Sequence, residues 1–172
     1  MNIFLIGYRA TGKSTVARNI AASLGLKCVD SDALIVQAAG MTITEIFARE
    51  TEEGFRERES EVVAKIALGD NQVVALGGGA VLRSENRAAI CNQGRIVWLQ
   101  ASVDSVCARL REDSQTQSQR PQLTSHDLYD EVSELMERRR SVYADIADFA
   151  VDTESLDAAE VALEVIATLS AS

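Results

Sequence analysis

The chain has few cysteines, one histidine, one proline and no long apolar segment. Its three cysteines, Cys28, Cys91 and Cys107, form no CxxC pair and no metal-binding spacing with the histidine, so we expect packing residues in a reducing compartment. No apolar run approaches the roughly 18 to 20 residues that a membrane-spanning helix needs. The first residues, MNIF, lack the basic segment and cleavage pattern of a signal peptide. These absences predict a cytoplasmic protein without a membrane anchor.

Basic residues are outnumbered by acidic ones, 17 to 26, which gives a formal net charge of −9. This balance argues against a nucleic-acid-binding surface spread over the molecule, although a single pocket can still be locally basic. With 172 residues, 47% of them hydrophobic and 25% charged, the composition is typical of one globular domain, residues 1–172. Any site for an anion must therefore be concentrated in one place.

Short apolar or β-branched runs alternate with longer segments of helical period. The runs NIFLI, VVALGG, RIVWLQ and FAVDT are typical of strands. The segment KSTVARNIAASLG is typical of a helix that a glycine, Gly25, terminates, and SVDSVCARLRED predicts a helix that begins at a Ser or Asp cap. Strands separated by helices imply crossover connections, so we predict an α/β fold with a mostly parallel sheet.

Residues 112–127, EDSQTQSQRPQLTSHD, do not fit this alternation. The segment is polar, lacks an apolar period and contains Pro121 and His126, the only proline and histidine of the chain. We interpret it as a mobile surface segment and His126 as a solvated loop residue. A loop of this length inside a compact domain is usually functional or disordered.

The stretch GYRATGKS, residues 7–14, matches G-x-x-x-x-G-K-[ST] at every fixed position and lies between a predicted strand and a predicted helix. Its glycines let the loop close around phosphate oxygens, and backbone N–H groups at the helix start favour the anion. Lys13 would reach the terminal phosphates, and Ser14 can ligate Mg²⁺. GTPases, motor ATPases and small-molecule kinases all use this loop. Because the chain has no Asn-Lys-x-Asp stretch and is short for a motor, transfer to a small acceptor or nucleotide binding without chemistry remains.

Two aspartates, Asp30 and Asp32, mark what we predict to be the end of a buried second strand. Residues two apart in a strand point to the same side, and the carboxyl end of a strand faces the ligand crevice of an open α/β sheet. One carboxylate could organise Mg²⁺ through water, while the other accepts the proton or hydrogen bond of an acceptor hydroxyl.

Further along the chain, an arginine and a glycine run fit an acceptor pocket. In a predicted helix, Glu53–Gly69, Arg56 and Glu59 form an i,i+3 pair that can hold the guanidinium in a fixed direction, which would suit a substrate carboxylate. Gly77–Gly79 directly follow a predicted strand, where they expose backbone N–H groups and let a ligand approach without a Cβ in the way.

In this order and separation, GYRATGKST, DSD, EEGFRERE, LGGGAV, RPQL and ERRRSVY resemble the motifs of the shikimate kinase family over essentially the whole chain. The resemblance implies a P-loop fold of the nucleoside-monophosphate-kinase type, a three-layer sandwich with a central, mostly parallel five-stranded sheet flanked by helices. It implies transfer of the ATP γ-phosphate to the 3-hydroxyl of shikimate, in the pathway to chorismate and the aromatic amino acids. Mg²⁺ would be the cofactor, shikimate and ATP the partners, and the protein a monomer that binds neither nucleic acid nor membrane.

The resemblance also implies roles for individual residues. The implied catalytic residues are Asp32, as partner of the shikimate hydroxyl, Lys13 and Arg120. The implied ATP site comprises Ala10, Thr11, Gly12, Lys13, Ser14, Thr15, Arg109 and Arg120, with Ser14 and Asp30 as metal ligands. The implied shikimate site comprises Asp32, Arg56, Gly77, Gly78, Gly79 and Arg139. Residues 112–127 would be a lid that excludes water from ATP, and residues 33–62 a substrate-binding helical region.

The chain departs from the family pattern at several positions. Ala10 stands where the family commonly has another glycine, and Thr51 stands where a glycine commonly opens the EEGFR stretch. RPQL replaces the commoner RPLL, and the stretch before it is a few residues longer. Two alternatives stay open: a gluconate-kinase-like enzyme of the same fold, and a nucleotide-binding regulator without turnover. Arg56, Arg139 and the triple glycine favour shikimate, and the intact site counts against a regulator.

Overall fold

Strand β1 (Asn2–Ile6) lies at the centre of a five-stranded sheet with the order β2-β3-β1-β4-β5, in which every neighbouring pair is parallel. The structure is a computed structural model that describes residues 1–112 and 128–171. The other strands are β2 (Lys27–Asp30), β3 (Gln72–Ala75), β4 (Gly94–Gln100) and β5 (Phe149–Asp152). The predicted α/β fold is confirmed, and the described sheet is parallel throughout.

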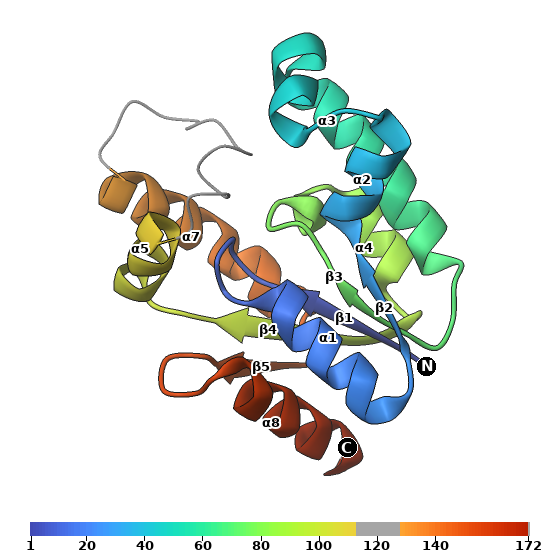
Figure 1. Cartoon of the computed structure of the whole chain (residues 1–172), viewed down its shortest axis with the longest axis vertical. Coiled ribbons are helices and arrows are strands. Elements are labelled where there is room, and N and C mark those ends of the chain that lie inside the picture. The colour runs from blue at the N-terminus through green and yellow to red at the C-terminus, as the bar shows by residue number, and fades with distance from the viewer. Residues whose placement is uncertain (113–127, 172) are drawn as a thin grey trace.

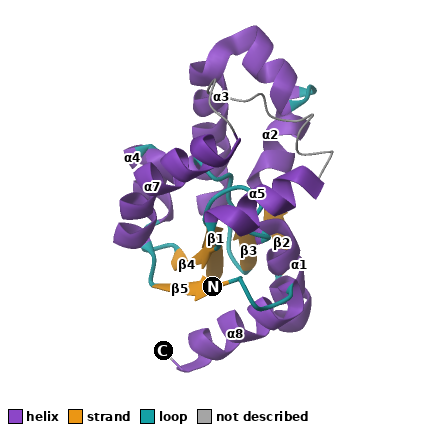
Figure 2. Ribbon diagram, turned by 90° about the vertical axis from the view of Figure 1, so that its left-hand side faces the viewer, coloured by secondary structure: helices purple, strands orange, loops and turns teal. Residues whose placement is uncertain are grey.

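Helices cover both faces of this sheet, so the fold has three layers (Figures 1 and 2). The described helices are α1 (Lys13–Leu24), α2 (Ser31–Ala39), α3 (Ile43–Ala67), α4 (Ser84–Ile90), α5 (Val103–Glu112), α7 (Leu128–Ile146) and α8 (Ala158–Ala171), with a short 3-10 helix, η1 (Ala80–Leu82). Among the residues that the structure describes, no helix has the length and apolar character needed to cross a membrane.

The central strand divides its side chains between two cores. Phe4 and Ile6 belong to a core that α3, α4 and α7 complete, whereas Ile3 and Leu5 belong to a core that α1 and α8 complete. All four side chains are almost fully buried. A parallel sheet covered on both faces favours apolar residues on both sides of its central strand, which explains the continuous apolar run IFLI, residues 3–6.

Two predicted helix ends are confirmed. Helix α1 ends at Gly25, whose φ of 66° lies in the left-handed region that a glycine enters without strain. Helix α5 follows Ser102, whose Oγ accepts a hydrogen bond from the Ser105 backbone N–H at 3.1 Å, as expected of a Ser cap.

The predicted helix Glu53–Gly69 corresponds to the second half of α3, after the non-helical residue Thr51, whereas α3 as a whole begins at Ile43. Thr42 and Glu45 form a reciprocal capping box there: the Glu45 backbone N–H donates to the Thr42 hydroxyl, and the Thr42 backbone N–H donates to the Glu45 carboxylate. The T-x-x-E spacing of such a box was present in the sequence.

Helix α3 is kinked at Thr51, where φ is 63° and ψ is 179°. A side chain in this region of backbone space is strained, and the conformation is almost restricted to glycine. The departure from the family pattern at this position therefore has a structural effect, since a β-branched residue holds the turn between the two halves of α3.

We predict that Thr51→Gly stabilises the protein by about 1 kcal/mol. Relief of a backbone strain of about 1–3 kcal/mol exceeds the entropic cost of about 0.5–1 kcal/mol that an added glycine brings. The change in the free energy of unfolding is measured by urea denaturation. Ala48→Gly, at an exposed and regular position of the same helix, is the control and should destabilise by about 1 kcal/mol. Equal losses in both variants would contradict strain at Thr51.

Candidate active site

The loop between β1 and α1 curls over the buried side chain of Lys13. The Lys13 Nζ donates hydrogen bonds to the backbone carbonyls of Gly7 at 2.9 Å and Tyr8 at 2.6 Å. Gly7 has a φ of 140°, and a Cβ there would lie 2.5 Å from the Leu99 carbonyl oxygen of β4, so no other residue fits. The loop is thus held against the carboxyl ends of two neighbouring strands.

The unusual loop residue Ala10 has a φ of 61°, in the left-handed region. The family's glycine would take this conformation without cost, whereas an alanine there is mildly strained. The substitution leaves the loop's other contacts in place: the neighbouring Thr11 hydroxyl donates to the Tyr8 carbonyl at 2.8 Å. Ala10 changes the backbone energy of the loop and removes no side-chain contact.

Ser14 and Asp30 meet at the open side of the loop. The Ser14 hydroxyl donates to the Asp30 Oδ2 at 2.6 Å. A hydroxyl and a carboxylate are the hard oxygen ligands that Mg²⁺ prefers. The described residues contain no group of three or more His, Cys, Asp or Glu side chains placed to hold a metal, so phosphate and water oxygens would have to complete the coordination of a cation here.

The prediction that Asp30 and Asp32 share one face of a buried strand is wrong. Strand β2 ends at Asp30 and only Val29 in it is buried, while Asp32 lies in the first turn of α2. The reason is helix capping: the Asp30 Oδ1 accepts hydrogen bonds from the backbone N–H groups of Asp32 at 3.0 Å and Ala33 at 3.2 Å, which starts the helix. Both aspartates nevertheless reach one cleft.

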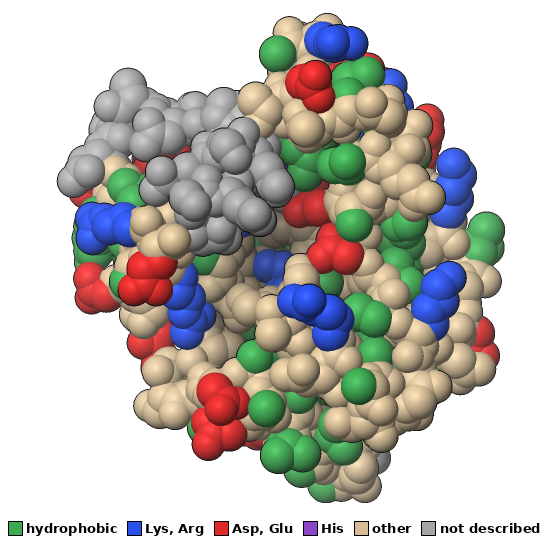
Figure 3. Space-filling model, viewed as in Figure 1, with side chains coloured by type: hydrophobic (Ala, Val, Ile, Leu, Met, Phe, Trp, Pro, Cys, Tyr) green, Lys and Arg blue, Asp and Glu red, His purple; other side chains and the backbone are tan. Residues whose placement is uncertain are grey.

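This cleft has a volume of about 590 Å³ and lies between the loop, the start of α2, the start of α3 and the end of β3. Figure 3 shows a hollow in this face of the molecule, with a basic side chain at its floor and acidic side chains beside it. Among the residues that line the cleft are Arg9, Ala10, Gly12, Lys13, Ser14, Thr15, Asp30, Asp32, Gly77 and Gly78. The structure therefore brings the phosphate-binding loop and the predicted acceptor residues Asp32, Gly77 and Gly78 into one space.

The three consecutive glycines form the meeting point of the cleft, and each is packed against a different group. A Cβ at Gly77 would lie 2.7 Å from the Asp32 Oδ1 and 2.9 Å from the Glu59 Oε1. A Cβ at Gly78 would lie 3.2 Å from the backbone N of Arg9, and one at Gly79 would lie 2.5 Å from the Arg56 Nη1. These glycines make room for the protein's own functional groups, and Gly77 and Gly78 also line the cleft, so the predicted approach of a ligand to their backbone stays a prediction.

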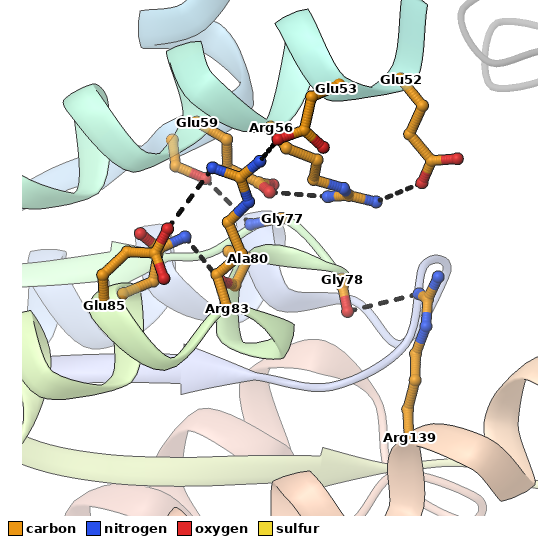
Figure 4. Close-up of polar contacts among 12 residues, drawn as sticks. Glu52, Glu53, Arg56, Glu59, Gly77, Gly78, Ala80, Arg83, Glu85 and Arg139 are labelled. Atoms are coloured by element: carbon orange, nitrogen blue, oxygen red, sulfur yellow. Dashed lines mark hydrogen bonds and ion pairs between the residues drawn. The ribbon is translucent and has the colours of Figure 1, made fainter.

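Arg56 and Arg139 reach this glycine turn from α3 and α7, as Figure 4 shows. The Arg56 Nη1 donates to the Glu59 Oε2 at 2.6 Å, which confirms the predicted i,i+3 pair, and the Glu59 side chain is only 1% exposed. The Arg139 Nη1 donates to the Gly78 carbonyl at 3.3 Å. Two guanidinium groups close to one turn form a positive site in an acidic protein.

The expected choice among the three consecutive arginines of α7 agrees with the structure. Arg138 and Arg140 are exposed, whereas Arg139 is half-buried against the Gly78 turn. Tyr143, one turn later, donates its hydroxyl to the same carbonyl at 2.5 Å. Burial raises the pKa of the Tyr143 phenol, while the nearby guanidinium of Arg139 opposes that rise, so the phenol keeps its proton as a donor at neutral pH.

On the other side of the loop, Arg109 of α5 donates to the Ala10 carbonyl and to the Thr153 carbonyl, both at 3.2 Å. It ties the phosphate-binding loop to the segment after β5 but does not line the cleft. The predicted residue Arg120, and the predicted lid beyond Glu112, lie outside the described residues.

Two site residues were missed from the sequence. Arg9 occupies a variable position of the loop motif, yet it is among the residues that line the cleft. Ser31 stands between the two aspartates, and its Oγ accepts a hydrogen bond from the Gly77 backbone N–H at 2.9 Å, which fixes the start of α2 to the glycine turn. The position of Ser31 between two candidate functional aspartates could have indicated that it belongs to the site.

Comparison with known proteins identifies close relatives of this architecture. Residues 9–170 match the family model described as shikimate kinase. The chain is 43% identical to a shikimate kinase of Rhodopirellula baltica over 165 residues, which cover 96% of this chain and 88% of that protein. It is also 43% identical to a shikimate kinase of Symbiobacterium thermophilum over 169 residues, covering 98% and 96%.

Solved structures give the same result. The fold superimposes on the shikimate kinase of Acinetobacter baumannii in complex with shikimate with a TM-score of 0.92 and 31% identity, covering 99% of this chain and 93% of that chain. A gluconokinase of Sinorhizobium meliloti is 18% identical with a TM-score of 0.61, covering 99% and 91%, which shows a shared fold alone.

We predict that Gly77→Ala lowers the rate of shikimate-dependent ADP release by about a hundredfold, because the new Cβ displaces the Asp32 carboxylate by up to about 1 Å. Nucleotide affinity, measured by calorimetric titration, should change less than twofold, since the phosphate-binding loop is not touched. Gly40→Asn is the control, because Asn tolerates the left-handed conformation and nothing lies within 4 Å of a Cβ at this position. A full rate in Gly77→Ala would contradict this packing.

Proposed function

The chain belongs to the shikimate kinase family and transfers the ATP γ-phosphate to the 3-hydroxyl of shikimate, and we propose that Asp32, Lys13 and Arg120 are its catalytic residues. The products are shikimate 3-phosphate and ADP, on the route to chorismate and the aromatic amino acids. The observation that carries the proposal is the single cleft that Lys13 and Asp32 both line. Groups that converge on one space can hold donor and acceptor in line for transfer.

The nucleotide side of the proposed site comprises residues 10–15 and the arginines Arg109 and Arg120. Lys13 and the loop N–H groups bind the phosphates, and Arg109 supports the loop through the Ala10 carbonyl. Ser14 and Asp30, whose side-chain oxygens are 2.6 Å apart, would hold Mg²⁺. The cation neutralises phosphate charge in reactions of this class.

On the acceptor side, Asp32 orients the attacking hydroxyl and takes its proton. Its place in the first turn of α2, beside Gly77, is fixed by the Asp30 cap and by the Ser31 contact. Arg56 and Arg139 bind the shikimate carboxylate, since both guanidinium groups reach the glycine turn and planar cations match planar carboxylates. Gly77, Gly78 and Gly79 offer backbone contacts to the substrate.

The proposal extends to parts of the chain that frame the cleft. Residues 33–62 form the substrate-binding region, because α2 and the first half of α3 line the cleft through Ala33, Val36 and Ile43. Residues 112–127, with Arg120, form the lid over ATP, on the strength of the family's motif order. We also propose a cytoplasmic monomer.

Coupled measurement of ADP release tests the function with Mg·ATP and either shikimate, gluconate or no acceptor. Release should require shikimate and should stop when EDTA removes the divalent cation, because unneutralised phosphates repel the attacking oxygen. Release with gluconate at a similar rate would favour the gluconate-kinase-like alternative. Absence of release with either acceptor, alongside measurable ATP binding, would favour a non-catalytic regulator.

Asp32→Asn should lower kcat by about 10²–10⁴-fold and leave the affinity for ATP within twofold. The amide keeps the size of the side chain but cannot take the proton of the hydroxyl. Asp145→Asn, at an exposed position of α7, is the matched control and should retain full kcat. A kcat within threefold of the unmodified protein in Asp32→Asn would remove Asp32 from the catalytic role.

A further inference from the structure

A second buried glutamate near the cleft, Glu131, has no role in the reaction as assigned above. It lies in the first turn of α7, and only 1% of its surface is exposed. Its charge acts on the neighbouring ring of Tyr8, one of the factors that raise the pKa of that phenol. A buried carboxylate is unfavourable unless a cation or hydrogen bonds compensate it.

The compensating cation in the described structure is Arg9. The Arg9 Nη2 lies 3.5 Å from the Glu131 Oε1, which links the phosphate-binding loop to α7. Within the described residues, the Arg9 Nε and the Glu131 Oε2 are buried without a hydrogen-bond partner. These are the other two atoms of a side-on, two-point contact between a guanidinium and a carboxylate, so the pair is aligned but only half formed.

Arg9 also borders the cleft. Arg9 lines the cleft together with Lys13 and Asp32. Its guanidinium lies 5.8 Å from the centre of the Tyr8 ring, and the guanidinium of Arg139 lies 5.4 Å from the same centre. Because Arg139 also contacts Gly78, this shared ring places Arg9 on the acceptor side of the loop.

The Arg9–Glu131 pair has the same arrangement as the Arg56–Glu59 pair at the glycine turn. Arg56 is held by Glu59, and Arg9 is held by Glu131; each glutamate is 1% exposed and each arginine is mostly buried. A buried glutamate fixes the direction of a long and otherwise mobile cation. Arginine prefers planar oxyanions, so the ligand class for Arg9 is the same as for Arg56.

We propose that Glu131 is a positioning residue that aims Arg9 at an oxyanion on the acceptor side of the cleft. The inference rests on the proposed function, because it requires an anionic acceptor or a phosphoryl group in transfer. Arg9 is then a third cationic contact beside Arg56 and Arg139.

The test compares Glu131→Gln with Glu137→Gln, an exposed position on the same helix. Glu131→Gln should lower kcat/KM for shikimate about five- to tenfold and leave ATP affinity within twofold, while Glu137→Gln changes neither. A loss confined to the KM for shikimate identifies the acceptor carboxylate as the oxyanion, and a loss confined to kcat identifies the phosphoryl group. An unchanged kcat/KM, or equal losses for shikimate and ATP, would overturn the proposal as a merely structural effect.

A double variant shows whether Glu131 acts through Arg9. Arg9→Gln should lower kcat/KM at least as much as Glu131→Gln, and adding Glu131→Gln to it should cause no further loss. Multiplied losses in the double variant would overturn the proposal. Glu131→Asp, which keeps the charge, replaces Glu131→Gln if the latter does not fold. Shikimate-dependent release of ADP by the unmodified protein and by Glu137→Gln reports on the proposed function separately.

Discussion

The close approach of three chain segments to the Gly77–Gly79 turn is the constraint on which the site depends. The Asp32 side chain of α2, the Glu59 and Arg56 side chains of α3 and the backbone of the phosphate-binding loop all occupy space that a Cβ on this turn would take. The turn itself is held by hydrogen bonds from Arg139 and Tyr143 to the Gly78 carbonyl and by the bond from the Gly77 N–H to Ser31. The positions of Asp32, of the guanidinium groups of Arg56 and Arg139 and of the phosphate-binding loop are therefore fixed by the same turn.

The charge near this turn is positive, whereas the net charge of the whole chain is negative. The chain carries a formal net charge of −9, yet Lys13 and Arg9 line one cleft, and Arg56 and Arg139 reach the glycine turn beside it. Buried glutamates pair with two of these cations, Glu131 with Arg9 and Glu59 with Arg56, and both glutamates are shielded from solvent. The concentrated positive charge favours anions at this place in a chain that is acidic as a whole.

Patterns that depend on local geometry were predictable from the sequence. The continuous apolar run of β1, the loop motif before α1 and the terminating Gly25 each follow from one physical requirement within a few residues, and the structure agrees. Asp32 shows the limit of this reasoning. Its side-chain direction depends on whether the Asp30 carboxylate caps a helix or extends a strand, and a two-residue spacing cannot distinguish these outcomes.

Contacts between distant segments were not predictable in the same way. The roles of Ser31 and Arg9 depend on partners, Gly77 and Glu131, that lie far away along the chain, and no periodicity reports such pairs. Likewise, the sequence indicated a functional role for the glycine run, but it did not predict which groups fill the space beside these glycines. The sequence showed that a threonine, Thr51, stands where the family commonly has a glycine, but the strain itself follows only from the backbone angles of that residue.

The hydrogen bonds from the Lys13 ammonium to the Gly7 and Tyr8 carbonyls satisfy this buried cation within the loop itself. In the role proposed for Lys13, phosphate oxygens of a nucleotide would replace these acceptors, and the two carbonyls would take them up again after the nucleotide leaves. A buried cation that has acceptors in both states avoids the cost of an uncompensated charge.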